Sequence, residues 1–108
     1  MKQNKYRIKD LPEDQRPREK LLKHGADKLN EVELLAVLLR TGTVGKSSLE
    51  LAKQILDDFG GYRGICGREL GDLKRVKGLG PAKIAQVAAA FEIASRIIEE
   101  VLRERNLK

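Results

Sequence analysis

Apolar residues along this chain recur mostly every three or four positions, which is the spacing of amphipathic helices. Leu49, Ala52, Ile55, Leu56 and Phe59, for example, fall on one stripe of a single helix. No segment shows the strict alternation of apolar and polar residues that predicts a strand. The pattern therefore predicts an all-α fold with about five helices.

Capping residues and prolines mark where the helices are expected to begin and end. Asn30 and Ser47 are each followed three residues later by a glutamate, which is the pattern of an N-terminal capping box. Pro17 and Pro81 suit the first position of a helix, where the missing N–H costs nothing. Gly25 is expected to end the first helix in the left-handed conformation. These signals predict helices at 17–24, 31–40, 48–59, 68–76 and 81–102.

The same periodicity predicts the core and the domain organisation. A chain of 108 residues suits one compact domain. Because Pro12 and Pro17 disfavour helix in the residues before them, residues 1–16 are expected to form an extended arm, and 17–108 a single helical domain. The predicted core contains Leu34, Leu38, Ile55, Phe59, Leu73, Ile84, Val87 and Phe91. The inner face of the last helix is expected to run on through Ala88, Ala94, Ser95 and Ile98.

The two halves of the sequence are approximately alike. The helix at 31–40, a glycine-containing turn and the helix at 48–59 are echoed by the helix at 68–76, another glycine turn and the last helix. The glycine spacing differs by one residue between the halves. We interpret the pattern as a duplicated helix-turn-helix unit.

The net charge is +6 and is unevenly spread, since residues 1–30 and 73–108 carry +4 each and residues 31–72 carry −2. Such a distribution suits a polyanionic partner, although it would also serve solubility alone. The scarcity of aromatic residues argues against a surface that stacks bases. Cys66 and His24 are the only cysteine and histidine, so neither a disulfide nor a zinc site is expected. No apolar run could span a membrane or serve as a signal peptide, which predicts a cytoplasmic protein.

The most informative stretch is Gly78-Leu79-Gly80, which leads directly into Pro81 and the last helix. Two glycines allow a sharp turn and a close approach of the backbone to a ligand, and Leu79 between them can anchor the turn in the core. The N–H groups at a helix N-terminus favour an anion. An ordinary packing turn is the alternative. The residues predicted to bind a nucleic-acid phosphate are Lys74, Arg75, Lys77, Gly78, Leu79, Gly80 and Lys83.

The segment Gly45-Lys46-Ser47 invites comparison with a nucleotide-binding P-loop. That loop requires a glycine five residues before its last glycine, and Arg40 occupies the position. Ser47 is therefore interpreted as a helix cap. Lys46 stays as a second, weaker phosphate contact.

Several segments, taken in order, resemble the N-terminal region of the RadC family of bacterial proteins, which is associated with DNA repair by name. They are Ile8-Lys9-Asp10-Leu11-Pro12, Arg16 to Leu21, Leu38 to Thr43, Gly45-Lys46-Ser47 and Lys77 to Lys83. The last of these is similar to the helix-hairpin-helix motif, which implies binding to a phosphate without reading base sequence. Members of the family continue into a JAB/MPN-type zinc metallopeptidase domain with an HxH…D pattern. This chain lacks that pattern, so the resemblance implies a lone module or a truncated piece.

The sequence thus predicts a DNA-binding module that contacts the phosphate backbone regardless of base sequence. The alternative is a docking domain for a protein partner or for a C-terminal metallopeptidase-like domain. No catalytic residues are found, so the chain is not expected to be an enzyme. No cofactor is expected, apart from a monovalent cation that the carbonyls of the 78–80 turn could hold.

Overall fold

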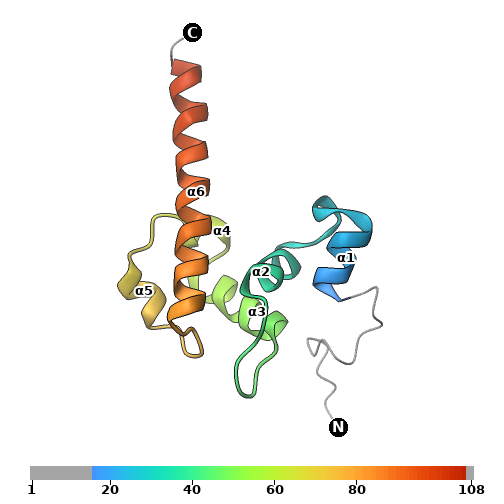
Figure 1. The fold of residues 1–108 in the computed structure, drawn as a ribbon. Coiled ribbons are helices and arrows are strands. Elements are labelled where there is room, and N and C mark those ends of the chain that lie inside the picture. The colour runs from blue at the N-terminus through green and yellow to red at the C-terminus, as the bar shows by residue number, and fades with distance from the viewer. Residues whose placement is uncertain (1–15, 107–108) are drawn as a thin grey trace.

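The computed structural model describes residues 16–106, and the account below concerns these residues (Figure 1). Within them the chain forms six α-helices and one 3-10 turn and no strand, which confirms the predicted all-α fold. The elements in order are α1 (Pro17–His24), η3 (Ala26–Lys28), α2 (Glu31–Leu39), α3 (Ser48–Phe59), α4 (Tyr62–Ile65), α5 (Leu70–Lys74) and α6 (Pro81–Asn106). The predicted arm at 1–16 lies outside the described residues except for Arg16.

Both predicted capping boxes are present. Asn30 accepts a hydrogen bond from the Glu33 backbone N–H at 2.8 Å, and the Glu33 carboxylate accepts one from the Asn30 N–H at 2.9 Å. Ser47 and Glu50 make the same reciprocal pair at 3.1 and 2.9 Å. Each box satisfies two N–H groups that a helix start otherwise leaves unpaired, and so fixes where α2 and α3 begin.

The structure corrects the predicted elements between α3 and α6. The short helix α4 was not predicted, because its four residues are too few to show a period and follow two glycines. The helix expected at 68–76 is shorter, since α5 covers only Leu70–Lys74. The number of α-helices in the described part is therefore six, where about five were expected.

Two boundaries also differ from expectation. Gly25 ends α1 with φ 95° and ψ 155°, which is a positive φ but not the left-handed helical conformation. Its extended ψ redirects the chain into η3. At the other end of the chain, α6 runs to Asn106, beyond the expected end near residue 102.

The core lies between α2, α3, α4 and the first half of α6. Its most deeply buried large side chains are Leu39, Leu51, Ile55 and Val87. The predicted core residues Leu38, Phe59, Ile84 and Phe91 pack against the core but stay partly exposed, whereas Leu73 is fully part of it. Leu34 was a wrong prediction. It is only half-buried, because α2 turns Leu35, Ala36 and Leu39 inward instead.

Polar contacts connect the helices around this core. The Lys20 ammonium on α1 lies 3.0 Å from the Glu33 carboxylate on α2. The Tyr62 hydroxyl on α4 donates a 2.6 Å hydrogen bond to the backbone oxygen of Glu31 at the start of α2. The Tyr62 ring also contacts Phe91 on α6, with 5.8 Å between ring centroids. One tyrosine thus joins three helices.

The C-terminal half of α6 projects away from the other helices (Figure 1). Ile98, expected on the inner face, is 52 % exposed, because no other described element reaches that far along the helix. Despite its 26 residues, α6 carries too many charges to cross a membrane, and no other helix in residues 16–106 qualifies.

Candidate nucleic-acid interface

The turn between α5 and α6 is built on two buried side chains. Val76 and Leu79 are each 7 % exposed and belong to the core cluster. The Leu79 N–H donates a hydrogen bond to the Val76 backbone oxygen at 3.2 Å, which closes the turn. The prediction that Leu79 anchors the turn is therefore confirmed.

The two glycines of this turn have different roles. Gly78 has φ 92°, and a Cβ there would lie 2.9 Å from the Thr43 methyl group, so this position requires glycine. A Cβ on Gly80 would meet no atom within 4 Å, and the φ of Gly80 is not positive. The absence of a side chain at Gly80 therefore serves neither local packing nor backbone conformation, and it leaves the adjoining backbone open to solvent.

The first turn of α6 offers free backbone donors. Gly80 accepts the first helical hydrogen bond, from the Ile84 N–H at 2.9 Å, so it is the N-cap residue. Pro81 has no N–H, and the N–H groups of Ala82 and Lys83 donate to no backbone oxygen within residues 16–106. The positive end of the dipole of a 26-residue helix lies at the same place. This combination favours an anion beside Gly80.

Three of the predicted cationic residues surround this turn in solvent. Lys74 and Lys77 are exposed. The Arg75 side chain is 84 % exposed, and its contact with Asp72 is loose, at 3.7 Å. All three side chains can therefore reach a ligand placed against the turn. The free energy lost by breaking the exposed Arg75–Asp72 ion pair is small.

Lys83, predicted to add charge at the phosphate site, lies in the first turn of α6 and contacts the end of α2. Its ammonium donates hydrogen bonds to the Leu39 backbone oxygen at 3.0 Å and to the Thr41 hydroxyl at 2.9 Å. It thereby caps the carbonyl end of α2, where the helix dipole favours a cation. These two bonds use two of the three N–H donors of the ammonium and hold the side chain against α2.

The loop between α2 and α3 forms a tight turn. Thr43 and Lys46 exchange two backbone hydrogen bonds, of 2.9 and 3.0 Å. A Cβ on Gly42 would lie 2.0 Å from the Lys46 backbone oxygen, so only glycine fits there. The half-buried Lys46 side chain donates to the Gln54 amide oxygen on α3. Lys46 is thus close to the predicted site but already has a partner.

The two turns meet in space, although 35 residues separate Thr43 from Gly78. Thr43 lies against Gly78, and Lys83 reaches back to Thr41. Both turns lie on the lower side of the molecule in Figure 1. The structure therefore brings the α5–α6 residues and the Lys46 loop into one surface, which we call the two-turn face (residues 40–47 and 74–83).

Arg40 is a candidate on this face that the sequence analysis did not propose as a contact. It is exposed, ends α2 and has φ 70°, the one positive φ at a non-glycine residue in the described chain. The sequence signal that could have identified it is its position at the end of the helix predicted at 31–40, directly before a glycine-containing turn. Together with Lys74, Arg75 and Lys77 it makes the solvent side of the two-turn face cationic.

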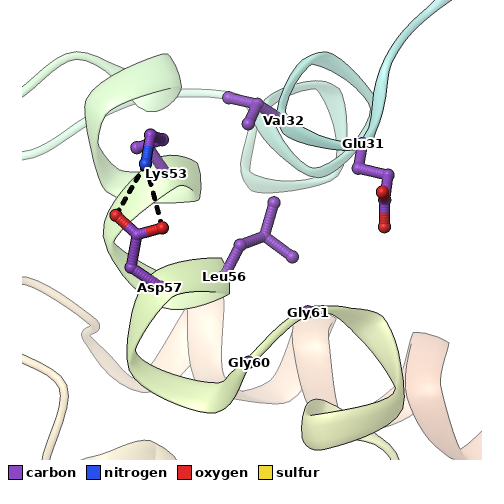
Figure 2. A pocket seen from close by; sticks show the side chains of 7 residues that line it. All are labelled: Glu31, Val32, Lys53, Leu56, Asp57, Gly60 and Gly61. Carbon is purple, nitrogen blue, oxygen red and sulfur yellow. Dashed lines mark hydrogen bonds and ion pairs between the residues drawn. The ribbon is translucent and has the colours of Figure 1, made fainter.

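An open cleft of about 430 Å³ lies between the start of α2 and the end of α3, away from the loop that joins the two helices (Figure 2). Val32 and Leu56 face one another across it, and Gly60 and Gly61 form one edge. Its polar groups are Glu31 and the pair of Lys53 with Asp57, 2.7 Å apart. With two carboxylates against one lysine that is already paired, this cleft repels phosphate.

The histidine and the cysteine of the chain lie on separate elements. His24 is exposed at the end of α1, and Cys66 is half-buried after α4. Within residues 16–106, no three histidine, cysteine or acidic side chains come close enough together to bind a metal ion. The predicted monovalent cation at the 78–80 carbonyls stays a prediction.

The known proteins that the chain is similar to come from bacteria. Residues 8–85 match the family described as UPF0758 N-terminal. A UPF0758 protein of Polaromonas sp. (strain JS666 / ATCC BAA-500) is 50% identical over 100 residues, covering 93% of this chain and 45% of the relative. A UPF0758 protein of Marinobacter nauticus is 50% identical over 93 residues, covering 86% of this chain and 42% of the relative.

The chain thus spans less than half the length of these relatives. The names of these relatives state a family and no activity. No solved structure matches the chain.

Proposed function

This chain belongs to the UPF0758 N-terminal family, and we propose that it is a DNA-binding module that contacts the phosphate backbone through the two-turn face. The observation that carries the proposal is the start of α6. There, unpaired N–H groups, an uncrowded glycine and three exposed cationic side chains lie on one turn.

The chemistry of this turn selects a phosphate group rather than a base. Backbone N–H groups and a helix dipole bind an anionic oxygen but do not distinguish one base from another. Lys74, Arg75 and Lys77 add charge that is not fixed in direction, which suits a repeating polyanion. Few contacts of this kind imply an affinity of about 10⁻⁴ to 10⁻⁶ M at physiological salt, with no sequence preference.

We interpret the two turns as a helix-hairpin-helix unit that is present twice, in keeping with the approximate repeat between the two halves of the sequence. In this proposal the α5–α6 turn is the principal contact. Arg40 and the backbone of the α2–α3 turn then widen the footprint along the nucleic acid. Lys46 and Lys83 act mainly by holding the two turns in place, because both already have partners inside the protein.

We further propose that the chain has no catalytic activity of its own and that its role in the cell concerns DNA repair. The role rests on the RadC resemblance alone. The lack of activity rests on the absence of a nucleophile with a neighbouring base among the candidate residues.

A salt titration tests the binding proposal. Fluorescence anisotropy is measured with two labelled duplexes of unrelated sequence, at about 50 and 200 mM salt. Three phosphate contacts predict that affinity falls about 40-fold between these concentrations, equally for both duplexes. Binding that does not change with salt would overturn the proposal in favour of protein docking, and so would a complete lack of binding at low salt.

A further inference from the structure

The projecting half of α6 carries five of the eight large apolar side chains that are exposed within residues 16–106. Five large apolar side chains there are exposed, namely Ile93 60 %, Ile97 54 %, Ile98 52 %, Val101 42 % and Leu102 53 %. Single exposed apolar residues are ordinary on soluble proteins. Five within ten residues of one helix form a stripe on the order of a few hundred Å², a size at which an exposed apolar patch is often functional.

This stripe continues the buried side of the same helix. Val87 and Phe91 pack into the core on the face where Ala94, Ile98 and Leu102 follow at helical spacing. The outward face is polar, and there Glu92 and Arg96 pair at 2.9 Å. The helix is therefore amphipathic over its whole length, but only its first half has a partner within residues 16–106.

We propose that this stripe is the docking surface for the polypeptide that follows the matched stretch in the longer members of the family. The family is described as N-terminal, and the chain covers 45% of the Polaromonas relative and 42% of the Marinobacter relative. More than half of each relative is thus available to cover the stripe. Because α6 is the last helix described, its projecting end is where such a polypeptide would lie closest.

The size of the stripe favours this tethered partner over a second copy of the chain. A stable interface between two free proteins buries about 800 Å² on each partner, which exceeds what the stripe offers. A segment joined to α6 is present at an effective concentration on the order of millimolar, so a smaller surface holds it in place. The partner surface must itself be apolar, because a charged group placed against these five side chains would lose its hydration.

Hydrogen exchange of α6 tests the proposal. The exchange rates of the amides at 93–102 are measured in this chain alone, and in a chimaera in which it replaces the matched stretch of the Polaromonas protein. If the segment is docked nine-tenths of the time, the chimaera exchanges about tenfold more slowly there. If the chimaera does not fold, the exchange rates are compared instead between the unaltered Polaromonas protein and its own matched stretch alone.

Two double variants make the measurement specific. Ile97→Lys with Val101→Lys should abolish the protection in the chimaera, because it buries charge in the interface. Glu99→Gln with Glu100→Gln changes the net charge equally but lies off the stripe, and it should leave the protection intact. Equal exchange in chain and chimaera would overturn the proposal. The proposal would also be overturned if the isolated chain sedimented as a dimer and the double variant Ile97→Lys, Val101→Lys sedimented as a monomer.

Discussion

The ammonium nitrogen of Lys83 lies 2.9 Å from the hydroxyl oxygen of Thr41, and this contact joins the start of α6 to the loop after α2. The same nitrogen also holds the last carbonyl of α2, that of Leu39. A residue whose sequence position suggested a ligand contact thus has a structural role. The distinction matters for mutagenesis, since changing Lys83 alters the shape of the two-turn face as well as its charge.

Replacing Lys83 by methionine should therefore reduce stability. The variant keeps the length of the side chain but loses two hydrogen bonds, at a cost of about 1–2 kcal/mol in the free energy of unfolding. Urea unfolding monitored by circular dichroism measures this cost. The control is Lys77→Met, which removes the same charge from an exposed side chain and should change stability by less than about 0.5 kcal/mol. Equal costs for the two variants would contradict the proposed role of Lys83.

The two glycines of the α5–α6 turn should separate binding from folding. Gly80→Val points into open space and should cost less than about 1 kcal/mol of stability. If a phosphate approaches this backbone, the variant should bind DNA roughly tenfold more weakly, because the valine displaces a charge-assisted hydrogen bond. Gly78→Val must adopt a positive φ beside Thr43, so it should destabilise the protein by about 1–3 kcal/mol. Unchanged DNA binding by a folded Gly80→Val protein would identify the turn as a packing element.

The exposed cations should contribute to affinity through salt-dependent contacts. Arg75→Gln and Lys77→Gln, made singly, should each lower the slope of log affinity against log salt by about 1 and weaken binding to all duplexes alike. Lys53→Gln, at the acidic cleft, is the matched control and should leave the slope unchanged. A slope that is the same in all three variants would place the DNA contact elsewhere.

Stability should fall at alkaline pH because of Tyr62. Burial raises the pKa of its phenol above the ordinary 10.0, and the nearby Glu31 carboxylate raises the pKa further. The unfolded tyrosine ionises first, so its contribution to stability is complete below pH 10 and is lost as pH rises toward the folded pKa. Tyr62→Phe should lose about 0.5–1.5 kcal/mol at pH 8 with its hydrogen bond to Glu31, and then decline less steeply above pH 10. Parallel decline of the two proteins in urea unfolding would refute this account.

Local signals made much of the fold predictable. The Asn30 and Ser47 capping boxes involve atoms three residues apart, so the sequence alone identifies them. Which of the leucines in α2 face the core was not readable, because nearly every residue of that helix is apolar and periodicity cannot set its phase. Leu34 was placed inside for that reason.

The candidate site was predictable in position but not in every role. Gly78-Leu79-Gly80 and the cations beside it were found because they are contiguous in sequence. The contacts of Lys83 with Leu39 and Thr41 join residues more than 40 positions apart in the sequence, so no local pattern predicts them. Ile98 was expected inside because its helical spacing is that of a core residue. Spacing shows which face of a helix is apolar, but not whether anything covers it.

The unbroken length of α6 has a mechanical consequence. The helix contains neither glycine nor an internal proline between Pro81 and Asn106, so nothing in its sequence favours a kink. At 1.5 Å per residue it is a rod of about 39 Å, with the two-turn face at one end and the apolar stripe toward the other. A body bound at each end would be held at a fixed spacing and rotation. Inserting one residue in the rod would turn one body by about 100° relative to the other, and inserting seven would nearly restore the original orientation at a longer spacing.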